Sequence, residues 1–296
     1  MSEAIPNKAL RCLVFLKLDH IGGLNTLFSI LFSGGAAISV EDRTAESVCS
    51  TIEKYKVMLL PTTPTFLNML LISGIYNQFD LSSLRIITYG TEPMPLSTLN
   101  GVRKVFSDVK LKQTYGLTEL GILATKSKSS DTDWLKIGGE GVETRVENGI
   151  LFIKTKTAML GYLNAESPFT DDGYYNTGDQ VEVDGDYFRI LGRDSEIINV
   201  GGEKVYPAEV ESVLLEMPNI KEALVSAKKN PVTGNIVFAD VVLDKEESRG
   251  DLTKRLVAFC QSRLEGFKIP KLVKISYASF MGDRLKKSRA KVLLES

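Results

Sequence analysis

The pattern of apolar residues changes twice along this chain, and those changes constrain the fold more than any other feature. In the first part, short apolar runs at 57–60, 85–89 and 109–113 alternate with segments of helical spacing such as 45–55. Runs of that length predict buried strands, and the spacing of the intervening segments predicts helices. The alternation is typical of an α/β fold in which helices cover a partly parallel sheet.

Two further helices are predicted between these strands, over residues 63–71 and 97–106. Pro64 suits the first turn of a helix, because its missing N–H would have no intrahelical partner there. Ser97 belongs to the residue types that cap helix N-termini, since its hydroxyl accepts a bond from a free backbone N–H. We therefore expect these two residues to mark the helix starts.

Between about residues 137 and 191 the turn signals come close together around β-rich runs such as 150–153. They are the dipeptides Gly-Gly at 138–139, Asn-Gly at 148–149, Asp-Gly at 172–173 and Asp-Gly at 184–185. Closely spaced turns of these types connect antiparallel strands. This segment is predicted to form a small antiparallel sheet or a barrel.

A third pattern, with helices and strands mixed, follows residue 192. Pro207 precedes a segment with one apolar face at 208–217. The other predicted elements are strands at 223–227 and 236–243, a helix at 251–264 and a strand at 273–277. They make an α+β unit of about one hundred residues, a usual domain size. We predict two domains, 1–191 (with the β-rich part at about 137–191) and 192–296, with the boundary near 192–195.

Bulk composition argues against several classes of protein. Of 296 residues, 43% are apolar and 25% charged, and the net charge of −1 predicts no general attraction to nucleic acid or to anionic membranes. Three widely spaced cysteines without a CxxC pair favour a reducing compartment. The longest apolar region, 24–40, is too short and too often interrupted to span a bilayer. We expect a cytoplasmic protein without a membrane span.

The run Thr-Tyr-Gly-Leu-Thr-Glu at 114–119 follows a predicted strand and carries groups suited to nucleotide phosphates. Gly116 would let the backbone approach a ligand, and the Thr118 hydroxyl can bond a phosphate oxygen. Glu119 can hold the hard Mg²⁺ that accompanies nucleotides. Taken alone, the run is more simply explained as an ordinary loop.

Two other polar positions suit a sugar. Asp179, after the turn Asn-Thr-Gly at 176–178, can accept bonds from two vicinal hydroxyls, although turn-capping aspartates are common. Arg193 adds a planar donor fourteen residues later, although a lone arginine is usually a surface group. A loop with Gly201 and Gly202 follows, in which paired glycines serve either a plain turn or the close passage of a thin substrate.

Taken in order, these segments resemble the adenylate-forming superfamily of acyl- and aryl-CoA synthetases, peptide-synthetase adenylation domains and luciferases. The resemblance implies the C-terminal part of that family's α/β N-domain, with sheet and helix layers plus a small β-barrel, followed by a small α+β lid domain. It implies adenine packing at Tyr115, phosphate contact at Thr118, magnesium binding at Glu119 and a ribose clamp at Asp179 and Arg193. It also implies ATP or AMP, Mg²⁺, and coenzyme A or phosphopantetheine as cofactors.

The same resemblance assigns further residues. The turn formed by Gly90, Thr91, Glu92 and Pro93 would lie along adenine and the acyl pocket, although Gly and Pro also mark plain turns. His20, the single histidine, would line the acyl site as a substrate contact and not as a base; its alternative is a structural role. Gly201 and Gly202 would face pantetheine, with Lys204 on the CoA side, whereas the helix charges Glu209 and Glu211 are predicted to be solvated.

Near the end, Phe-Lys-Ile-Pro-Lys at 267–271 is similar to a family motif, and counting on from it places Lys286 on the lysine that binds the forming acyl phosphate. Leu285 departs from the usual glycine there, so a solvated basic tail is the alternative. Ser195 departs from the usual Asp or Lys of the hinge. The family's phosphate-binding loop, which ends in Pro-Lys-Gly, has no counterpart between residues 1 and 19.

Two functions are compatible with these features. One is an enzyme that makes an acyl-adenylate from a small carboxylic acid and MgATP and passes the acyl group to a thiol of CoA or of a carrier protein. The other is a truncated or split relative that binds AMP or adenylate without activating ATP, or that complements a separate N-terminal half. The missing phosphate loop motivates the second hypothesis.

Overall fold

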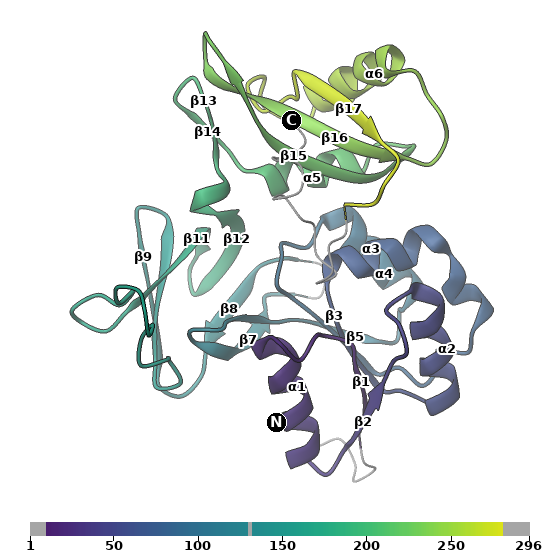
Figure 1. The fold of residues 1–296 in the computed structure, drawn as a ribbon, viewed down its shortest axis with the longest axis vertical. Coiled ribbons are helices and arrows are strands. Elements are labelled where there is room, and N and C mark those ends of the chain that lie inside the picture. Colours follow the sequence, from purple (N-terminus) through teal and green to yellow (C-terminus); the bar gives the residue numbers. More distant parts are fainter. Residues whose placement is uncertain (1–9, 130–131, 281–296) are drawn as a thin grey trace.

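The computed structural model describes residues 10–129 and 132–280. Its N-terminal part is a five-stranded parallel sheet with strand order β2-β1-β3-β4-β5 (Figure 1). The strands are β1 (Arg11–Val14), β2 (Ala36–Ser39), β3 (Leu59–Thr62), β4 (Ile86–Tyr89) and β5 (Lys110–Gln113). The predicted α/β alternation is confirmed, and the carboxyl ends of β3, β4 and β5 meet at one edge of the sheet.

Four α-helices connect these strands, namely α1 (Ile21–Phe32), α2 (Ala45–Tyr55), α3 (Pro64–Ser73) and α4 (Leu96–Val105), with a short 3₁₀ turn η1 (Ile75–Gln78) after α3. Helices α2, α3 and α4 pack their apolar sides onto one face of the sheet and build the first hydrophobic core. Helix α1 lies apart from them, beyond β1 and β2 in Figure 1. The two faces of this sheet are therefore covered unequally.

The predicted helix starts had different outcomes. Helix α3 begins at Pro64, and the Thr63 hydroxyl accepts a bond from the Phe66 N–H at 3.2 Å, as expected for a cap. The start at Ser97 was wrong, because α4 begins at Leu96 and Pro95 holds the N-cap position without a side-chain bond. The fixed φ of proline sets the extended entry into this helix.

A seven-stranded antiparallel sheet follows, in the order β6-β7-β8-β12-β11-β10-β9. Its strands are β6 (Tyr115–Leu117), β7 (Gly121–Ser127), β8 (Leu135–Gly138), β9 (Val142–Glu147), β10 (Ile150–Thr155), β11 (Tyr175–Asp184) and β12 (Tyr187–Arg193). The hydrogen-bonded order is open, with β6 and β9 at its ends, and β8 also contacts β9, so the predicted small antiparallel sheet is confirmed. The sheet begins about twenty residues before the predicted segment 137–191, because strands β6 and β7 also belong to it.

The C-terminal part starts with the 3₁₀ turn η2 (Asp194–Glu196) and has its own hydrophobic core. Its elements are β13 (Ile198–Val200), β14 (Glu203–Val205), α5 (Pro207–Leu215), β15 (Ile220–Asn230), β16 (Gly234–Leu243), α6 (Arg249–Gln261) and β17 (Leu272–Ser276). Strands β15, β16 and β17 form one sheet, and β13 and β14 form a hairpin. The predicted helices and strands of this part are all present.

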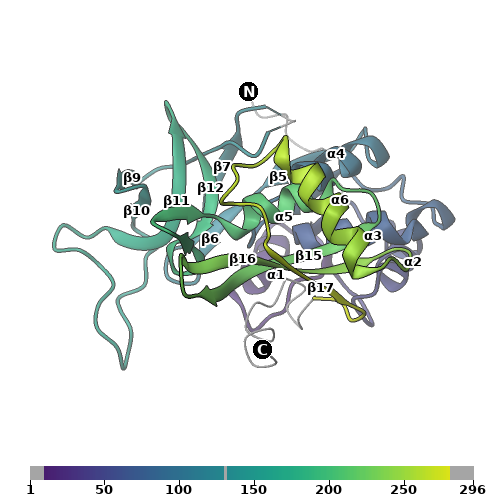
Figure 2. The ribbon, with the colours of Figure 1, turned by 90° about the horizontal axis from the view of Figure 1, so that it is seen from above.

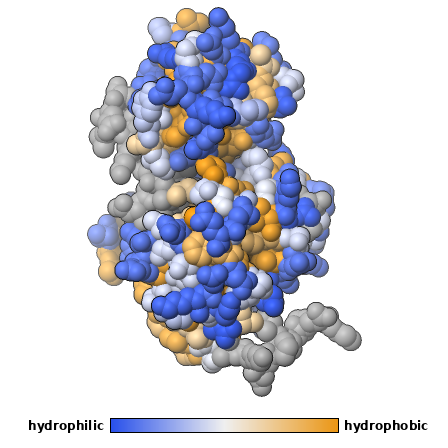
Figure 3. Space-filling model, turned by 90° about the vertical axis from the view of Figure 1, so that its right-hand side faces the viewer, coloured by the Kyte–Doolittle hydropathy of each residue, from blue (hydrophilic) through white to orange (hydrophobic). Residues whose placement is uncertain are grey.

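The C-terminal part lies above the parallel sheet in Figure 1 and in front of it in Figure 2. Asn68 of α3 joins the two parts by donating to the backbone oxygen of Lys221 at 3.1 Å. Hydrophobic residues reach the surface along their boundary and over much of the lower part (Figure 3). Within 10–129 and 132–280, no helix is both long and apolar enough to cross a membrane.

Candidate functional site

A cleft of about 640 Å³ lies where the parallel sheet, the antiparallel sheet and the C-terminal part meet. Its walls come from the start of α3, the turn after β4, strands β5, β6 and β12, and helix α5. Cavities of this size at a junction of structural units are usual ligand sites. The predicted site residues that line it are Thr91, Glu92, Pro93, Tyr115, Gly116, Asp179 and Arg193.

The centre of the cleft is a cluster of Tyr115, Asp179 and Arg193. The Tyr115 hydroxyl donates to Asp179 Oδ2 at 2.6 Å, and Arg193 Nε lies 2.8 Å from Asp179 Oδ1. Arg193 also donates from Nη1 to the backbone oxygen of Thr177 at 3.1 Å. Asp179 and Arg193 are direct neighbours across β11 and β12, so the sheet register fixes their separation.

Burial sets the electrostatics of this cluster. Only 5% of Asp179 is exposed, and this desolvation raises the pKa of its carboxyl although Arg193 and Tyr115 act in the opposite direction. Burial, together with the neighbouring Asp179, also raises the pKa of the Tyr115 hydroxyl well above its usual value. The hydroxyl is thus a hydrogen-bond donor, and the carboxylate keeps free lone pairs for a ligand.

The turn after β4 approaches the cleft in a constrained conformation. Gly90 lies against Thr114, where a Cβ would come within 2.5 Å of its hydroxyl oxygen, so only glycine fits. Thr91 has a φ of 74°, which is rare and strained for a β-branched residue. Glu92 Oε1 accepts a bond from the Thr65 N–H at 2.8 Å and holds this turn against the start of α3. Gly90 itself lies behind the wall of the cleft.

Thr118 and Glu119 lie in the turn between β6 and β7 and do not line the cleft. Thr118 is exposed, and the Tyr162 hydroxyl donates to Glu119 Oε1 at 2.7 Å. No group of three or more His, Cys, Asp or Glu side chains suited to a metal occurs within 10–129 and 132–280. Glu119 is therefore a single carboxylate, which matches a cation whose other ligands come from substrate phosphates.

His20 occupies the N-cap position of α1, outside the cleft. Its Nε2 lies 3.7 Å from Asp19 Oδ1, and this buried nitrogen makes no hydrogen bond to the described residues. Gly201 and Gly202 form the turn of the β13–β14 hairpin with φ values of 63° and 97°, and they too lie away from the cleft. Two successive positive φ values require residues such as glycine.

One lysine that the sequence analysis left without a role lines the cleft. Lys268 Nζ lies 2.8 Å from both Glu209 Oε1 and Glu265 Oε2. Burial works against its charge, but the bonds to the two glutamates outweigh that effect and raise the pKa of Lys268. The sequence feature that could have marked Lys268 as a site residue is its position in the 267–271 motif.

The prediction of solvated helix charges was wrong for Glu211. Only 3% of this residue is exposed, and its Oε1 accepts a bond from the Val225 N–H at 2.9 Å. Helix α5 turns this side chain toward β15, so that it fixes the helix onto the sheet. Glu209, on the other hand, is bound by Lys268 at the cleft.

A second group at the cleft was missed entirely. Asp133, Glu182 and Arg189 come from the segment before β8 and from β11 and β12. Burial raises the pKa of the Asp133 carboxyl, while the charge of Arg189 lowers it. Arg189 is paired with Glu182. Asp133 lies in a polar segment with no recognisable motif, so nothing in the sequence marked it.

Two predictions concern the ends of the C-terminal part. Lys286, with the basic residues around it, lies outside the described residues. Ser195 is the middle residue of η2, directly between the two parts. Beside it, Asp194 Oδ1 accepts a bond from Gln180 Nε2 at 3.0 Å, which ties this turn to β11.

Comparison with known proteins agrees with this arrangement. The pattern of the family described as AMP-binding enzyme matches residues 2–163, and that of the AMP-binding enzyme C-terminal domain matches residues 209–289. The 2-succinylbenzoate–CoA ligase of Bacillus licheniformis is 32% identical over 281 residues, which are 88% of this chain and 56% of that protein. The chain thus spans little more than half the length of this relative.

Two solved structures show the same fold. An anthranilate CoA ligase in complex with anthranoyl-AMP matches with a TM-score of 0.84 and 23% identity, over 97% of this chain and 60% of that chain. The o-succinylbenzoate coenzyme A synthetase of Bacillus subtilis, in complex with ATP and magnesium ion, matches with a TM-score of 0.79 and 28% identity, over 99% and 63%.

Proposed function

This chain belongs to the family of AMP-binding enzymes, and from that premise we propose that it acts in the adenylation of a small carboxylic acid and the transfer of the acyl group to a thiol. A carboxylate oxygen attacks the α-phosphorus of ATP and pyrophosphate leaves. The sulfur of CoA or phosphopantetheine then attacks the acyl carbon, and AMP leaves. The cluster that Tyr115 and Arg193 form around the buried carboxylate of Asp179 carries the proposal.

Asp179 is the ribose group in this proposal. Its Oδ2 already accepts a bond from the Tyr115 hydroxyl and its Oδ1 is ion-paired with Arg193, and each oxygen keeps a lone pair for a sugar hydroxyl. Because the carboxylate is desolvated, bonds to it contribute more than they would on the surface. Tyr115 presents the adenine contact, and the turn of Thr91, Glu92 and Pro93 forms the neighbouring wall.

The residues for phosphate and metal come from the β6–β7 turn. Thr118 would bond a phosphate oxygen, and Glu119 would hold Mg²⁺, which neutralises charge on the phosphates when bound. Glu119 fits this role once its bond to Tyr162 is exchanged for the metal. Lys286 would bind the reacting carboxylate and phosphate. His20 would contact the acyl group, and Gly201 and Gly202 the pantetheine arm.

Pyrophosphate exchange tests the catalytic proposal. Carboxylates from the names of the relatives, 2-succinylbenzoate and anthranilate, are supplied with ATP and Mg²⁺, and incorporation of labelled pyrophosphate into ATP is measured. Exchange that depends on a carboxylate and is lost in Asp179→Asn supports the proposal. Asp172→Asn is the matched control, because Asp172 pairs with Arg145 on the same sheet outside the cleft. Absence of exchange with every acid contradicts catalysis by this chain.

A second candidate is a nucleotide-binding protein that does not activate ATP by itself. The observation that favours it is that Thr118 and Glu119, the residues proposed for phosphate and metal, lie outside the cleft that Tyr115, Asp179 and Arg193 line. Calorimetry with AMP, ATP and CoA distinguishes the two candidates, since AMP binding as tight as ATP binding, without exchange, is expected only for the second.

A further inference from the structure

Two pairs of a tyrosine and a carboxylate join strand β6 and the turn after it to strand β11. In the first pair, the Tyr115 hydroxyl donates to Asp179 Oδ2 at 2.6 Å. Glu119 lies four residues after Tyr115, in the turn between β6 and β7. Tyr175 lies four residues before Asp179 at the start of β11, about 13 Å along the strand. The side chains of Glu119 and Tyr175 interact, so they form a second pair with the residue types exchanged.

The second pair is shared with a further tyrosine, Tyr162. The Tyr162 hydroxyl donates to Glu119 Oε1 at 2.7 Å. Burial raises the pKa of Tyr175, and so do the Tyr162 hydroxyl and the charge of Glu119, which places the three groups together. Tyr162 is 43% exposed, whereas Tyr175 is 7% exposed and packs edge-on against Phe169. Tyr162 can therefore turn away into solvent, and Tyr175 cannot.

The segment that carries Tyr162 is fastened to the same turn by other bonds. Thr157 Oγ1 donates to the backbone oxygen of Leu120 at 2.7 Å. The Met159 N–H donates to the backbone oxygen of Glu119 at 2.7 Å, and Met159 also packs against the core of the antiparallel sheet. Loss of the hydroxyl bond of Tyr162 would thus leave the backbone of this segment in place. The bond acts on the Glu119 side chain and is not needed to attach the segment.

We propose that Tyr162 and Tyr175 are positioning residues with opposite effects on the cation that Glu119 binds, an inference that rests on the proposed function of Glu119. In the nucleotide-free chain, Tyr162 occupies the carboxylate. Tyr162 leaves Oε1 when Mg²⁺ enters with the nucleotide phosphates. The hydroxyl of Tyr175, no longer engaged with Tyr162, then donates to the carboxylate and fixes its orientation. Tyr162 thus competes with the cation, and Tyr175 supports the cation's ligand.

The two tyrosines should therefore change cation affinity in opposite directions. The bond from Tyr162 must break before the cation takes Oε1, so this hydroxyl lowers the affinity by the strength of one hydrogen bond. A donor behind a metal-binding carboxylate holds it in the orientation that the metal needs, so the Tyr175 hydroxyl raises the affinity. If both tyrosines only held the turn in place, removal of either hydroxyl would act in the same direction.

The test is the cation dependence of ATP binding, which needs no turnover. Isothermal titration calorimetry measures the affinity of the full chain for ATP with Mn²⁺ and with EDTA, and the ratio of the two affinities gives the contribution of the cation. Tyr162→Phe should raise this ratio up to about tenfold. Tyr175→Phe should lower it about tenfold or more. Glu119→Gln supplies the ratio that remains without a metal-binding carboxylate, which should lie below that of the parent chain.

Tyr174→Phe is the matched control, because the Tyr174 hydroxyl donates to Glu143 on the same sheet and outside the cleft. It should leave the ratio unchanged, and circular dichroism should show every variant folded. If the parent chain does not bind ATP, or has the same ratio as Glu119→Gln, the cation role of Glu119 falls together with this inference. If those two ratios differ, but either tyrosine variant matches the parent chain or both move in one direction, the inference alone is overturned.

Discussion

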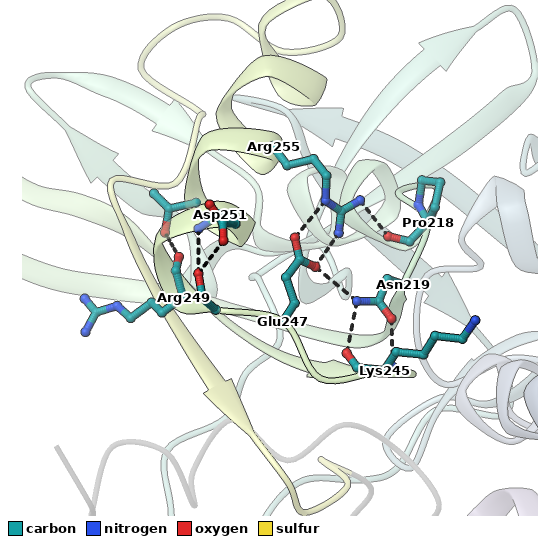
Figure 4. Close-up of polar contacts among 9 residues, drawn as sticks. Pro218, Asn219, Lys245, Glu247, Arg249, Asp251 and Arg255 are labelled. Atoms are coloured by element: carbon teal, nitrogen blue, oxygen red, sulfur yellow. Dashed lines mark hydrogen bonds and ion pairs between the residues drawn. The ribbon is translucent and has the colours of Figure 1, made fainter.

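Two arginine–carboxylate pairs of this molecule have similar bonds but opposite electrostatics. In the cleft, Arg193 pairs with Asp179 and donates to a backbone oxygen. In the C-terminal part, outside the cleft, Arg255 pairs with Glu247 through two bonds, at 3.0 and 2.7 Å, and also donates to a backbone oxygen, that of Pro218 (Figure 4). Burial raises the pKa of Asp179, whereas the bonds from Arg255 lower the pKa of Glu247.

The difference lies in what surrounds each carboxylate. Asn219 donates to Glu247 Oε2 at 3.0 Å and to the backbone oxygen of Lys245 at 3.1 Å, so this cluster ties the end of β16 to the turn before β15. Asp179 lines an open cleft, and its side-chain partners within residues 10–129 and 132–280 are Tyr115 and Arg193 of the same sheet. An ion pair alone therefore does not indicate a binding site, whereas a desolvated carboxylate at a cleft is a candidate for one.

The largest effect is expected for Asp179→Asn. The amide cannot accept two charge-assisted bonds from a ribose, each of which contributes about 1.5–3 kcal/mol, so AMP affinity should fall on the order of 100-fold. Isothermal titration calorimetry measures this loss. Asp172→Asn should retain the affinity. If Asp179→Asn bound AMP as tightly as the parent chain, Asp179 would not be a ribose-binding residue, and the two ion pairs would not differ in function.

Tyr115→Phe should have a smaller effect at the same site. It removes one bond to Asp179 and leaves the aromatic ring, so we expect AMP affinity to fall about tenfold, equivalent to about 1.4 kcal/mol. Tyr174→Phe is the control, because the Tyr174 hydroxyl donates to Glu143 at 3.0 Å on the same sheet, outside the cleft. Equal affinities for the two variants would mean that this hydroxyl does not position the carboxylate for AMP.

Glu247→Gln should change stability and not binding. Loss of the charge at this partly exposed pair should lower the free energy of unfolding by about 1 kcal/mol, the usual upper value for such pairs. Urea denaturation at pH 7 measures the change, and AMP calorimetry should show none. A loss of AMP affinity in this variant would contradict a purely structural role.

The smallest effect is the pH dependence of stability, which should have opposite signs for the two pairs. The raised pKa of Asp179 contributes stability below its unfolded pKa, and that contribution is lost as pH rises through the folded pKa. Asp179→Asn should therefore gain stability relative to the parent chain as pH rises from 3 to 7. The urea midpoints of both chains are measured at each pH. If Asp179→Asn gained stability relative to the parent chain as the pH fell, the raised pKa of Asp179 would be contradicted.

The lowered pKa of Glu247 works the other way. Its contribution is present above the unfolded pKa, 4.5, and is lost as pH falls through the folded pKa. The parent chain should thus exceed Glu247→Gln in stability most clearly near neutral pH, and the difference should shrink on acidification. A difference independent of pH would show that the carboxylate is not held ionised by Arg255.

Much of the fold was predictable because the signals are local. Helix α2 spans residues 45–55, the segment whose apolar residues have helical spacing. The capping of α3 by Thr63 follows from the residue types alone. The start of α4 was misplaced because Ser97 and Pro95 both signal helix starts, and local chemistry does not rank them. The burial of Glu211 was missed because it depends on β15, which is remote in the sequence.

The sequence by itself indicated most helices and strands and, through the family resemblance, the association of Asp179 with Arg193. Their alignment across β11 and β12 depends on a register shift between Gln180 and Val181 that the turn at 184–185 does not predict. Only the tertiary structure brought Tyr115 and Lys268 to the same cleft, since these contacts join distant segments. It alone also decided that Asp179 is desolvated. Burial depends on how complete layers pack around a residue, and periodicity within one element does not encode it.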